Sequence, residues 1–409
     1  QSERVLHAAV VYYLWAEVAR RRSRHLSFRE RGSMMCSGNR CSCVRMVVQT
    51  LVLLVLLLGA SGCVVCMDAV DSRNVYIADH AEIGIIETRS NIDKSRIVLY
   101  DKDLNEIGSV PLDIAGVEQA WGNLPVVGTC VYVAPYGNFK EGQGHEVLQI
   151  DRTDLSVTPF DVDERVLNGA AASDRYVFAF NDLNLTSTIS RCSKETGEVK
   201  KVIIPDDHVT SAIFAEGSLW VFAQRQGSTG EEEDQIGLLY QFSEELEKIG
   251  IYDVSACGSG QYRVLVHEGK LYFTSLEKAQ GCDLRRVGVF DLVEDELSWI
   301  QLEKDYPSAM AVFDGKLLVS HCDVIAGRNT CSYLSVCDLA GGKVETRKLA
   351  HDVTEMVVIG TKLYMANSWE RELYAYDANS FELEKSVVVS SMDDDYSYLS
   401  NIFSMNDAD

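Results

Sequence analysis

Proline is scarce in this sequence, and low-complexity tracts are absent. Six prolines in 409 residues predict a folded chain in which disorder is confined to the ends and a few loops. The signatures GxSxG, HExxH and the P-loop are also missing, so no nucleophile elbow, zinc pair or phosphate cradle of these types is expected. Long amphipathic helical stretches are lacking too, which argues against an α/β fold. No cofactor is predicted.

Positive charge is missing from most of the chain. The formal net charge is −23, yet residues 1–62 hold nine Arg, no Lys and three Glu, a net of +6. Subtracting these from the 38 basic and 61 acidic residues leaves 29 and 58 in 63–409, a net of −29. Such a body repels phosphate backbones and anionic head groups, so nucleic acid is not an expected partner. The excess of negative charge serves solubility or, alternatively, recruits cationic ligands or metal ions.

An uncharged apolar run occupies residues 46–62 and is preceded by Arg40 and Arg45. A basic region, an apolar core and small residues at a cleavage site are the three parts of an export signal. The run is short for a transmembrane helix, which needs about 20 apolar residues. The stretch ASGC that ends at Cys63 resembles the bacterial lipobox, in which the cysteine thiol takes the lipid. We therefore expect Cys63 to be acylated, with an ordinary signal anchor as the alternative.

Four parts are expected along the chain. Residues 1–33 precede any methionine and are interpreted as an N-terminal extension from a mis-set start, or alternatively as a short basic cytoplasmic arm. Residues 34–62 are the predicted lipoprotein signal peptide, 63–73 the tether and 74–409 the folded domain. Acyl chains would hold that domain at the cell envelope, on the extracytoplasmic side of the membrane.

One phrase recurs: an apolar strand, a Gly turn and a second apolar strand. Its clearest copies are IFAEGSLWVFAQ (213–224), VLVHEGKLYFTS (264–275), AVFDGKLLVSH (311–321) and VVIGTKLYMANS (357–368). Third strands follow the phrase and end at residues 101, 151, 193, 243, 291, 338 and 377. Seven copies about 46 residues apart are typical of four-stranded blades. The sequence therefore predicts an all-β fold, a seven-bladed β-propeller.

The two ends of the domain complement each other. NVYIAD (74–79) matches the second strand of a blade with no inner strand before it, and YLSNIFSMND (398–407) matches an inner strand. We therefore expect the C-terminal strand to pair with the N-terminal one in the first blade. This pairing would close the ring and protect two sheet edges.

Some of these phrases resemble a known group of repeats. NVYIAD, KLYFTS and KLYMANSWERELYAYDANSFELEKSV resemble the repeats of YVTN-type propellers of bacterial surface lipoproteins, over nearly all of residues 74–406. The resemblance implies an extracytoplasmic binding or scaffold module. It carries over no functional residue.

Export would place the cysteines where disulfides form. Cys322 and Cys331 flank one loop, and Cys257 and Cys282 lie in two connections on the same face, so both pairs are predicted disulfides. Metal binding is the rival, but the mature domain has no CxxC pair with partner ligands, so no metal site is predicted. The cysteines that fall within strands are expected to be buried free thiols: Cys130, Cys192 and Cys337.

The longer connections of the predicted propeller emerge on one face, which makes that face the expected binding surface. Titratable and polar residues lie near the predicted inner strands, at the mouth of a central channel. They are His208, Tyr262, Tyr306, His351 and Asp352. Imidazole, phenol and carboxylate groups together bind ligands or perform acid–base chemistry, although polar residues also simply collect in loops.

These features favour a non-enzymatic, lipid-anchored module that binds a protein, peptide or glycan at the cell envelope. The alternative hypothesis is an envelope hydrolase or lyase that acts through His208 or His351. A quinone-dependent dehydrogenase is a third and more distant hypothesis.

Overall fold

The computed structural model describes the propeller domain with several gaps. The described residues are 72–89, 94–112, 114, 116–117, 122, 124–135, 144–183, 186–227, 234–279, 282–323, 332–392 and 397–406. The predicted signal peptide and Cys63 lie outside them. Within the described part, no helix has the length and apolar character that crossing a bilayer requires.

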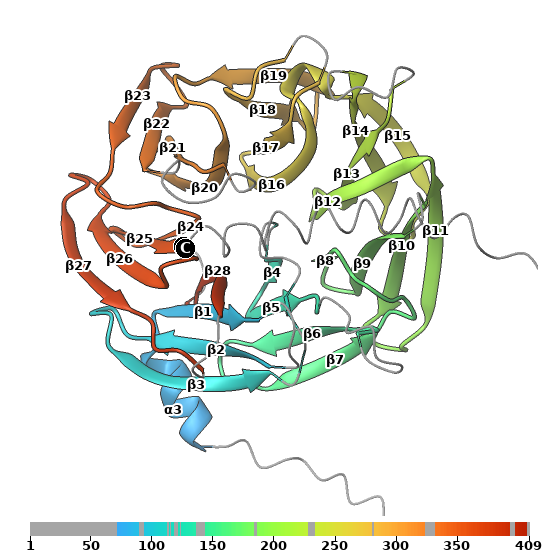
Figure 1. The fold of residues 1–409 in the computed structure, drawn as a ribbon. Coiled ribbons are helices and arrows are strands. Elements are labelled where there is room, and N and C mark those ends of the chain that lie inside the picture. The colour runs from blue at the N-terminus through green and yellow to red at the C-terminus, as the bar shows by residue number, and fades with distance from the viewer. Residues whose placement is uncertain are drawn as a thin grey trace, which may run out of the picture. The chain divides into compact units, whose positions relative to one another are not determined.

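Seven four-stranded antiparallel sheets follow one another around a ring, and each is a blade of a β-propeller (Figure 1). From the inner to the outer strand, blade 1 has β28 (Tyr398–Ser404), β1 (Ile83–Thr88), β2 (Ser95–Tyr100) and β3 (Glu106–Leu112). Blade 2 has β4 (Val126–Val127), β5 (Cys130–Val133), β6 (Glu146–Asp151) and β7 (Val157–Asp161). Blade 3 has β8 (Gly169–Ala172), β9 (Tyr176–Leu183), β10 (Thr186–Ser193) and β11 (Val199–Pro205). Blade 4 has β12 (Asp207–Ala215), β13 (Ser218–Arg225), β14 (Ile236–Ser243) and β15 (Lys248–Asp253).

The remaining blades repeat this order. Blade 5 has β16 (Ser259–His267), β17 (Lys270–Glu277), β18 (Arg286–Asp291) and β19 (Glu296–Gln301), and is preceded by the short 3-10 helix η4 (Ser255–Cys257). Blade 6 has β20 (Pro307–Phe313), β21 (Lys316–His321), β22 (Tyr333–Asp338) and β23 (Val344–Lys348). Blade 7 has β24 (Glu355–Ile359), β25 (Lys362–Asn367), β26 (Glu372–Asp377) and β27 (Leu383–Val388). The predicted seven-bladed fold is confirmed, and each predicted third strand coincides with the third strand of a blade.

The ring closes through β28, as predicted. This strand pairs antiparallel with β1, and Phe403 lies opposite Gly84. The partner strand is therefore 83–88, and the prediction of a strand at 74–79 is wrong. Every residue of β1 is buried, whereas the upstream segment buries few side chains and forms the helix α3 (Ser72–His80). A segment with one narrow apolar face is better packed as a helix than as a strand buried on both faces.

Glu87 fixes the beginning of the closing strand. Its side chain is fully buried and accepts hydrogen bonds from Arg96 Nε at 2.7 Å, Ser397 Oγ at 2.5 Å and the Met392 amide at 3.1 Å. Arg371 of blade 7 lies 3.2 Å from the same carboxylate. A buried carboxylate needs such cationic and hydrogen-bonding partners, so Glu87 ties blade 7, blade 1 and the closing segment together.

Arg152 fixes the other end of the closing strand. Its side chain is buried and donates to the carbonyl oxygens of Ser404 at 2.9 Å and Asn406 at 2.6 Å. It also donates to Gly128 at 2.6 Å and Thr129 at 3.1 Å within blade 2. One planar guanidinium thus links the last residues of β28 to the neighbouring blade.

A phenylalanine ring covers a cross-strand glycine in three blades. The pairs are Phe403 on Gly84, Phe180 on Gly169 and Phe273 on Gly288. A Cβ added at Gly84 would lie 2.2 Å from the ring of Phe403, which is closer than two carbon atoms can approach. Glycine is therefore required for the ring of the closing strand to lie flat on β1.

We expect Gly84→Ala to lower the free energy of unfolding by about 1–3 kcal/mol, because the methyl group overpacks the seam between β28 and β1. Urea unfolding of the single and double variants measures this cost. In a Phe403→Leu background the added methyl should cost less, since the ring that it strikes is gone. Equal costs in both backgrounds would contradict this account of the seam.

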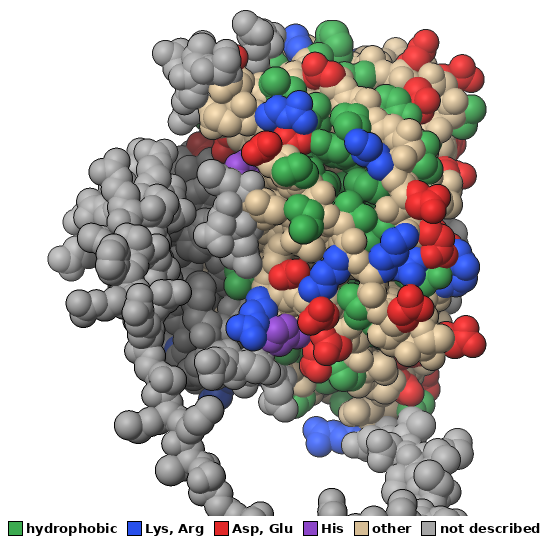
Figure 2. Space-filling view, turned by 90° about the vertical axis from the view of Figure 1, so that its right-hand side faces the viewer, with side chains coloured by type: hydrophobic (Ala, Val, Ile, Leu, Met, Phe, Trp, Pro, Cys, Tyr) green, Lys and Arg blue, Asp and Glu red, His purple; other side chains and the backbone are tan. Residues whose placement is uncertain are grey.

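The hydrophobic core lies between neighbouring blades rather than in one central body. Phe178 of blade 3 packs with Leu219 and Val221 of blade 4, and Trp220 lies 5.6 Å from Phe290 of blade 5, measured between ring centroids. Both faces of the inner three strands are thereby covered, which explains their near-continuous apolar sequences. The outer strands are half-exposed, and Figure 2 shows apolar side chains scattered among acidic and basic ones on the side that carries β11 and β15.

Cys257 and Cys282 are both buried free thiols, so the disulfide predicted between them is absent. Each sulfur faces a backbone oxygen, Ser298 at 3.8 Å for Cys257 and Asp283 at 3.0 Å for Cys282. A disulfide needs a specific geometry between its two sulfur atoms, and the neighbouring loop positions predicted from the sequence do not by themselves supply it.

The second predicted disulfide stays a prediction, because Cys331 lies outside the described residues. Its proposed partner Cys322 is buried at the end of β21. The strand cysteines are free thiols. Cys192 and Cys337 are buried as expected, whereas Cys130 is only half-buried.

Candidate functional site

His208 is the second residue of the inner strand β12. The chain passes from the outer strand of blade 3 to this strand through the single residue Asp206, whose φ of 63° gives a tight turn. His208 Nδ1 lies 2.7 Å from Oδ2 of Asp182 in β9 of the preceding blade. The imidazole side chain is 31% exposed. An imidazole–carboxylate pair therefore bridges blades 3 and 4 where the inner strand begins.

The residue before His208 anchors this end of the strand. Asp207 is fully buried and accepts from Arg225 Nε at 2.6 Å and Nη2 at 2.8 Å. The hydroxyl of Tyr240 donates to the same carboxylate. A bidentate arginine contact fixes orientation as well as charge, so the backbone at His208 is held by two neighbouring strands.

A polar network beside His208 joins blades 4 and 5. Gln224 lies opposite His208 in the β12–β13 ladder. Its amide donates to Glu277 Oε2 of blade 5 at 2.8 Å and also to Gln235. Ser259, at the start of β16, donates to Gln235 at 3.0 Å. Amide, hydroxyl, imidazole and carboxylate groups of three blades thus lie together at one end of the inner strands.

The surroundings of His208 favour its charged form. The hydrogen bond to Asp182 raises the pKa of His208 above its ordinary value, and the negative charges of Asp182, Asp207 and Glu277 act in the same direction. Partial burial opposes them by disfavouring the cation. At a pH above the raised pKa, the imidazole is neutral, Nδ1–H donates to Asp182, and Nε2 presents a lone pair.

No hydrogen bond to Nε2 is formed among the described residues, and no serine or threonine hydroxyl of that part is bonded to the ring. The nucleophile–base contact of a covalent hydrolase is thus not formed there. The pair can still accept a proton or a hydrogen bond from a molecule that approaches from solvent. The described part also contains no group of three or more His, Cys, Asp or Glu side chains that could hold a metal ion.

Tyr262 and Tyr306 do not share this site. Tyr262 lies inside β16, is 4% exposed and donates to the Pro307 carbonyl at 3.2 Å, so it packs between blades 5 and 6. The prediction that it lines a channel mouth is corrected by this burial. Tyr306 is half-buried and precedes β20 with a φ of 57°, where its role is to make the turn into blade 6.

His351 and Asp352 form a separate contact. The His351 ring stacks on Tyr374 with ring centroids 3.5 Å apart, and its Nε2 lies 2.6 Å from the Tyr376 hydroxyl. Burial lowers the pKa of His351. Asp352 is buried and accepts from Ser332 at 2.7 Å. The connection into blade 7 therefore packs against β26. Of the five predicted residues, His208 is the one that lies beside the polar network of blades 4 and 5.

Sequence reasoning missed a buried ion pair between inner strands. Arg263 of β16 and Glu355 of β24 form a salt bridge, and their side chains are 7% and 5% exposed. Arg263 also donates to the Gly122 carbonyl at 2.6 Å, and Asn401 of β28 lies 3.3 Å from the same oxygen. These contacts join blades 5, 7 and 1 near the axis of the ring. The pair is buried, so it supports the fold and offers little surface to a ligand.

The sequence did contain a signal for this pair. Arg263 and Glu355 each stand directly before an apolar run at a predicted inner strand, in RVLV and EMVVI. A charge at a buried strand position requires a partner. Asp182 had no comparable signal. It lies near the end of the second strand of its blade, where polar residues are common at the surface.

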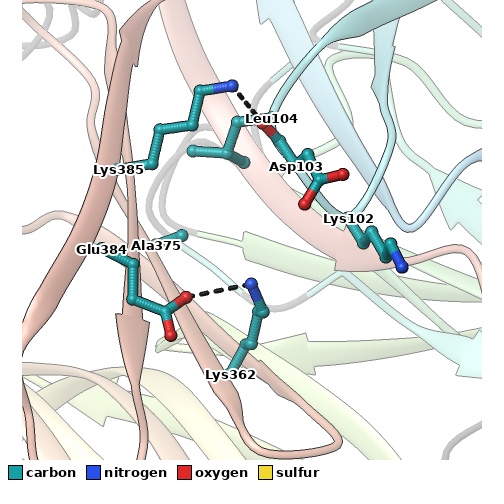
Figure 3. A pocket seen from close by; sticks show the side chains of 7 residues that line it. All are labelled: Lys102, Asp103, Leu104, Lys362, Ala375, Glu384 and Lys385. Carbon is teal, nitrogen blue, oxygen red and sulfur yellow. Dashed lines mark hydrogen bonds and ion pairs between the residues drawn. The ribbon is translucent and has the colours of Figure 1, made fainter.

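A pocket of about 190 Å³ lies at the seam between blades 7 and 1. Figure 3 shows its lining residues: Lys102, Asp103, Leu104, Lys362, Ala375, Glu384 and Lys385. Lys362 pairs with Glu384 at 2.9 Å, and Lys385 donates to the backbone of Asp103. Two of its three ammonium groups are thus used within the protein, and the pocket is better understood as part of the contact between blades.

Comparison with known proteins supports the fold alone. No family model matches the chain, and no curated protein matches it. The crystal structure of AztD from Citrobacter koseri is similar, with 11% identity, 79% of this chain and 97% of that chain covered, and a TM-score of 0.51. The apo form of AztD covers the same shares at 10% identity and a TM-score of 0.50. Likeness at this identity shows a shared β-propeller architecture.

Proposed function

We propose that this chain is a lipid-anchored binding module of the cell envelope, whose recognition surface surrounds His208. The observation that carries the proposal is the arrangement at His208: a partly exposed imidazole held by Asp182 and followed by the Gln224–Glu277 network of blades 4 and 5. Polar groups on the ends of rigid strands are suited to orient a ligand. The buried Arg263–Glu355 pair offers no comparable surface.

The anchoring part of the proposal is supported by the sequence around Cys63. The basic region, apolar run and small residues before this cysteine match an export signal with a lipobox. The first described element, α3, begins at Ser72, so a short tether would separate the acylated residue from the propeller. The ligand is a protein, a peptide or a glycan exposed at the envelope.

A hydrolase or lyase is the second candidate, and the Asp182–His208 pair is the observation in its favour. A carboxylate that orients an imidazole is the arrangement of a general base. The two functions differ in their response to His208→Gln with a panel of envelope substrates. Loss of turnover would favour the enzyme, whereas the absence of turnover in the parent protein together with capture of a partner would favour the binding module.

We expect Cys63→Ala to release the protein from the membrane fraction or to leave its precursor unprocessed, because the acylated thiol is removed. Detergent partitioning and the mass of the processed chain measure both outcomes. Cys66→Ala is the matched control and should stay anchored and processed. Unchanged partitioning of Cys63→Ala would contradict the lipid anchor.

A further inference from the structure

We propose that the Asp182–His208 pair binds a cationic ammonium group, such as a lysine side chain of a partner peptide, through Nε2 of His208. The inference rests on the proposed function, because it names the ligand class of that surface. His208 Nδ1 is engaged by Asp182 at 2.7 Å. The side chain is 31% exposed, and the neutral ring then keeps a lone pair at Nε2, which accepts from a donor such as an ammonium group.

The charges around the ring select the sign of the ligand. Three carboxylates act on His208, from Asp182 of β9, Asp207 of β12 and Glu277 of β17. Arg225 of β13 neutralises Asp207 through a bidentate contact. The carboxylate of Asp182 has the imidazole as its hydrogen-bonding partner in the described part, and its buried Oδ1 atom has none. An anionic ligand would be repelled there, whereas a cation is attracted.

The rest of the domain reinforces this selection. Residues 63–409 carry a formal net charge of −29, from 29 basic and 58 acidic residues. A field of that sign raises the local concentration of cations and the rate at which they encounter the surface. The neighbouring Gln224 and Glu277 add further hydrogen-bonding groups on blades 4 and 5, so that a peptide extending from the ammonium group has polar partners beside it.

The proton and the ammonium group compete for the same nitrogen. When Nε2 carries a proton, the ring is cationic and offers no acceptor, so binding of the ammonium group requires the neutral ring. Affinity should therefore rise with pH and level off above the pKa of His208, which is raised by Asp182. A neutral glycan would show no such dependence, and an anionic ligand would show the reverse.

The test uses the full chain in detergent and an acetylated, amidated glycine–lysine–glycine peptide as the probe. A histidine with a pKa of at least about 6.5 is neutral in at most about one molecule in ten at about pH 5.5. We therefore expect binding to be at least about tenfold weaker at about pH 5.5 than at about pH 8. The same peptide with norleucine in place of lysine should not bind measurably at either pH.

Three variants separate the site from general electrostatics. His208→Gln should abolish the pH difference, and Asp182→Asn should weaken binding at about pH 8. Glu268→Gln removes one negative charge from an exposed turn, where the side chain is 81% exposed, and should behave like the parent. Equal binding of the norleucine peptide, an affinity that is constant or falls with pH, or a pH difference that survives in His208→Gln would overturn the proposal. Capture of an envelope partner despite that result would leave the binding module intact and reject the ammonium site alone.

Discussion

Deletion of residues 398–409 is expected to abolish cooperative folding of the propeller. The deletion removes β28 and with it Leu399, Ile402, Phe403 and Met405, all of them buried. Burial of each such side chain contributes about 1.5–3 kcal/mol, so the four together contribute roughly as much as the 5–15 kcal/mol by which a typical domain is stable. The same deletion removes the carbonyl groups that Arg152 binds and leaves β1 as an open edge.

Circular dichroism during heating measures this outcome. The truncated chain should lack the sharp melting transition of the parent or show a Tm many degrees lower. A chain that lacks only residues 407–409 retains the whole of β28 and is the matched control. A synthetic peptide of residues 397–406 should restore the transition to the truncated chain, because it supplies the missing strand. A truncated chain that melts like the parent would contradict the closure of the ring by β28.

Glu355→Gln is expected to lower the free energy of unfolding by about 3–5 kcal/mol. The substitution leaves the guanidinium of Arg263 buried without its ionic partner, and an uncompensated buried charge is strongly destabilising. Arg263 would retain its bond to the Gly122 carbonyl, which does not neutralise its charge. Urea unfolding at about pH 8.5, above the pKa of about 7 that burial gives Glu355, measures the loss while the carboxylate is ionised.

The double variant Glu355→Gln with Arg263→Met is the control for this prediction. It removes the charge together with its partner, so it should be more stable than Glu355→Gln alone. If Arg263→Met destabilised the Glu355→Gln chain by as much as it destabilises the parent, the two residues would not be coupled. The ion pair would then not join blades 5 and 7 in the manner described.

Stability of the parent should also depend on pH through Glu355. Burial raises the pKa of Glu355 to about 7, against the opposing effect of Arg263. The folded state then binds a proton more tightly than the unfolded state, so this residue's contribution to stability falls as pH rises from about 4.5 to about 7. Comparison of the parent with the Glu355→Gln variant over that range isolates the contribution, since glutamine does not titrate.

The blade repeat could be read from the sequence because its physical cause is local. A Gly turn between two apolar strands, as in VLVHEGKLYFTS, fixes a hairpin without reference to distant residues. Closure by YLSNIFSMND could be predicted for the same reason. Its sequence matches an inner strand that is not followed by further strands, so it must pair with the strands of another blade. The prediction for NVYIAD failed because a short apolar run does not by itself distinguish a helix from a strand. In the structure the segment is helical, and Ile77 lies against Gly108 of β3.

The site was less predictable because its members come from different blades. His208 could be identified from its place before an inner strand, but its partner Asp182 is 26 residues away and depends on how blades 3 and 4 meet. Tyr262 and His351 occupy similar places in the repeat, yet their surroundings differ. Tyr262 is buried between blades 5 and 6, and His351 stacks on Tyr374. Position within a repeat predicts the face of a residue and not its burial.

Hydrogen exchange of the closing strand tests the central claim most directly. The amides of residues 399–403 and of residues 84–86 belong to one sheet, so they should exchange at similarly slow rates and lose protection together in denaturant. Mass spectrometry of the corresponding peptides resolves the two strands. Exchange of 399–403 that is orders of magnitude faster than that of 84–86 would show that the tail is not the inner strand of blade 1.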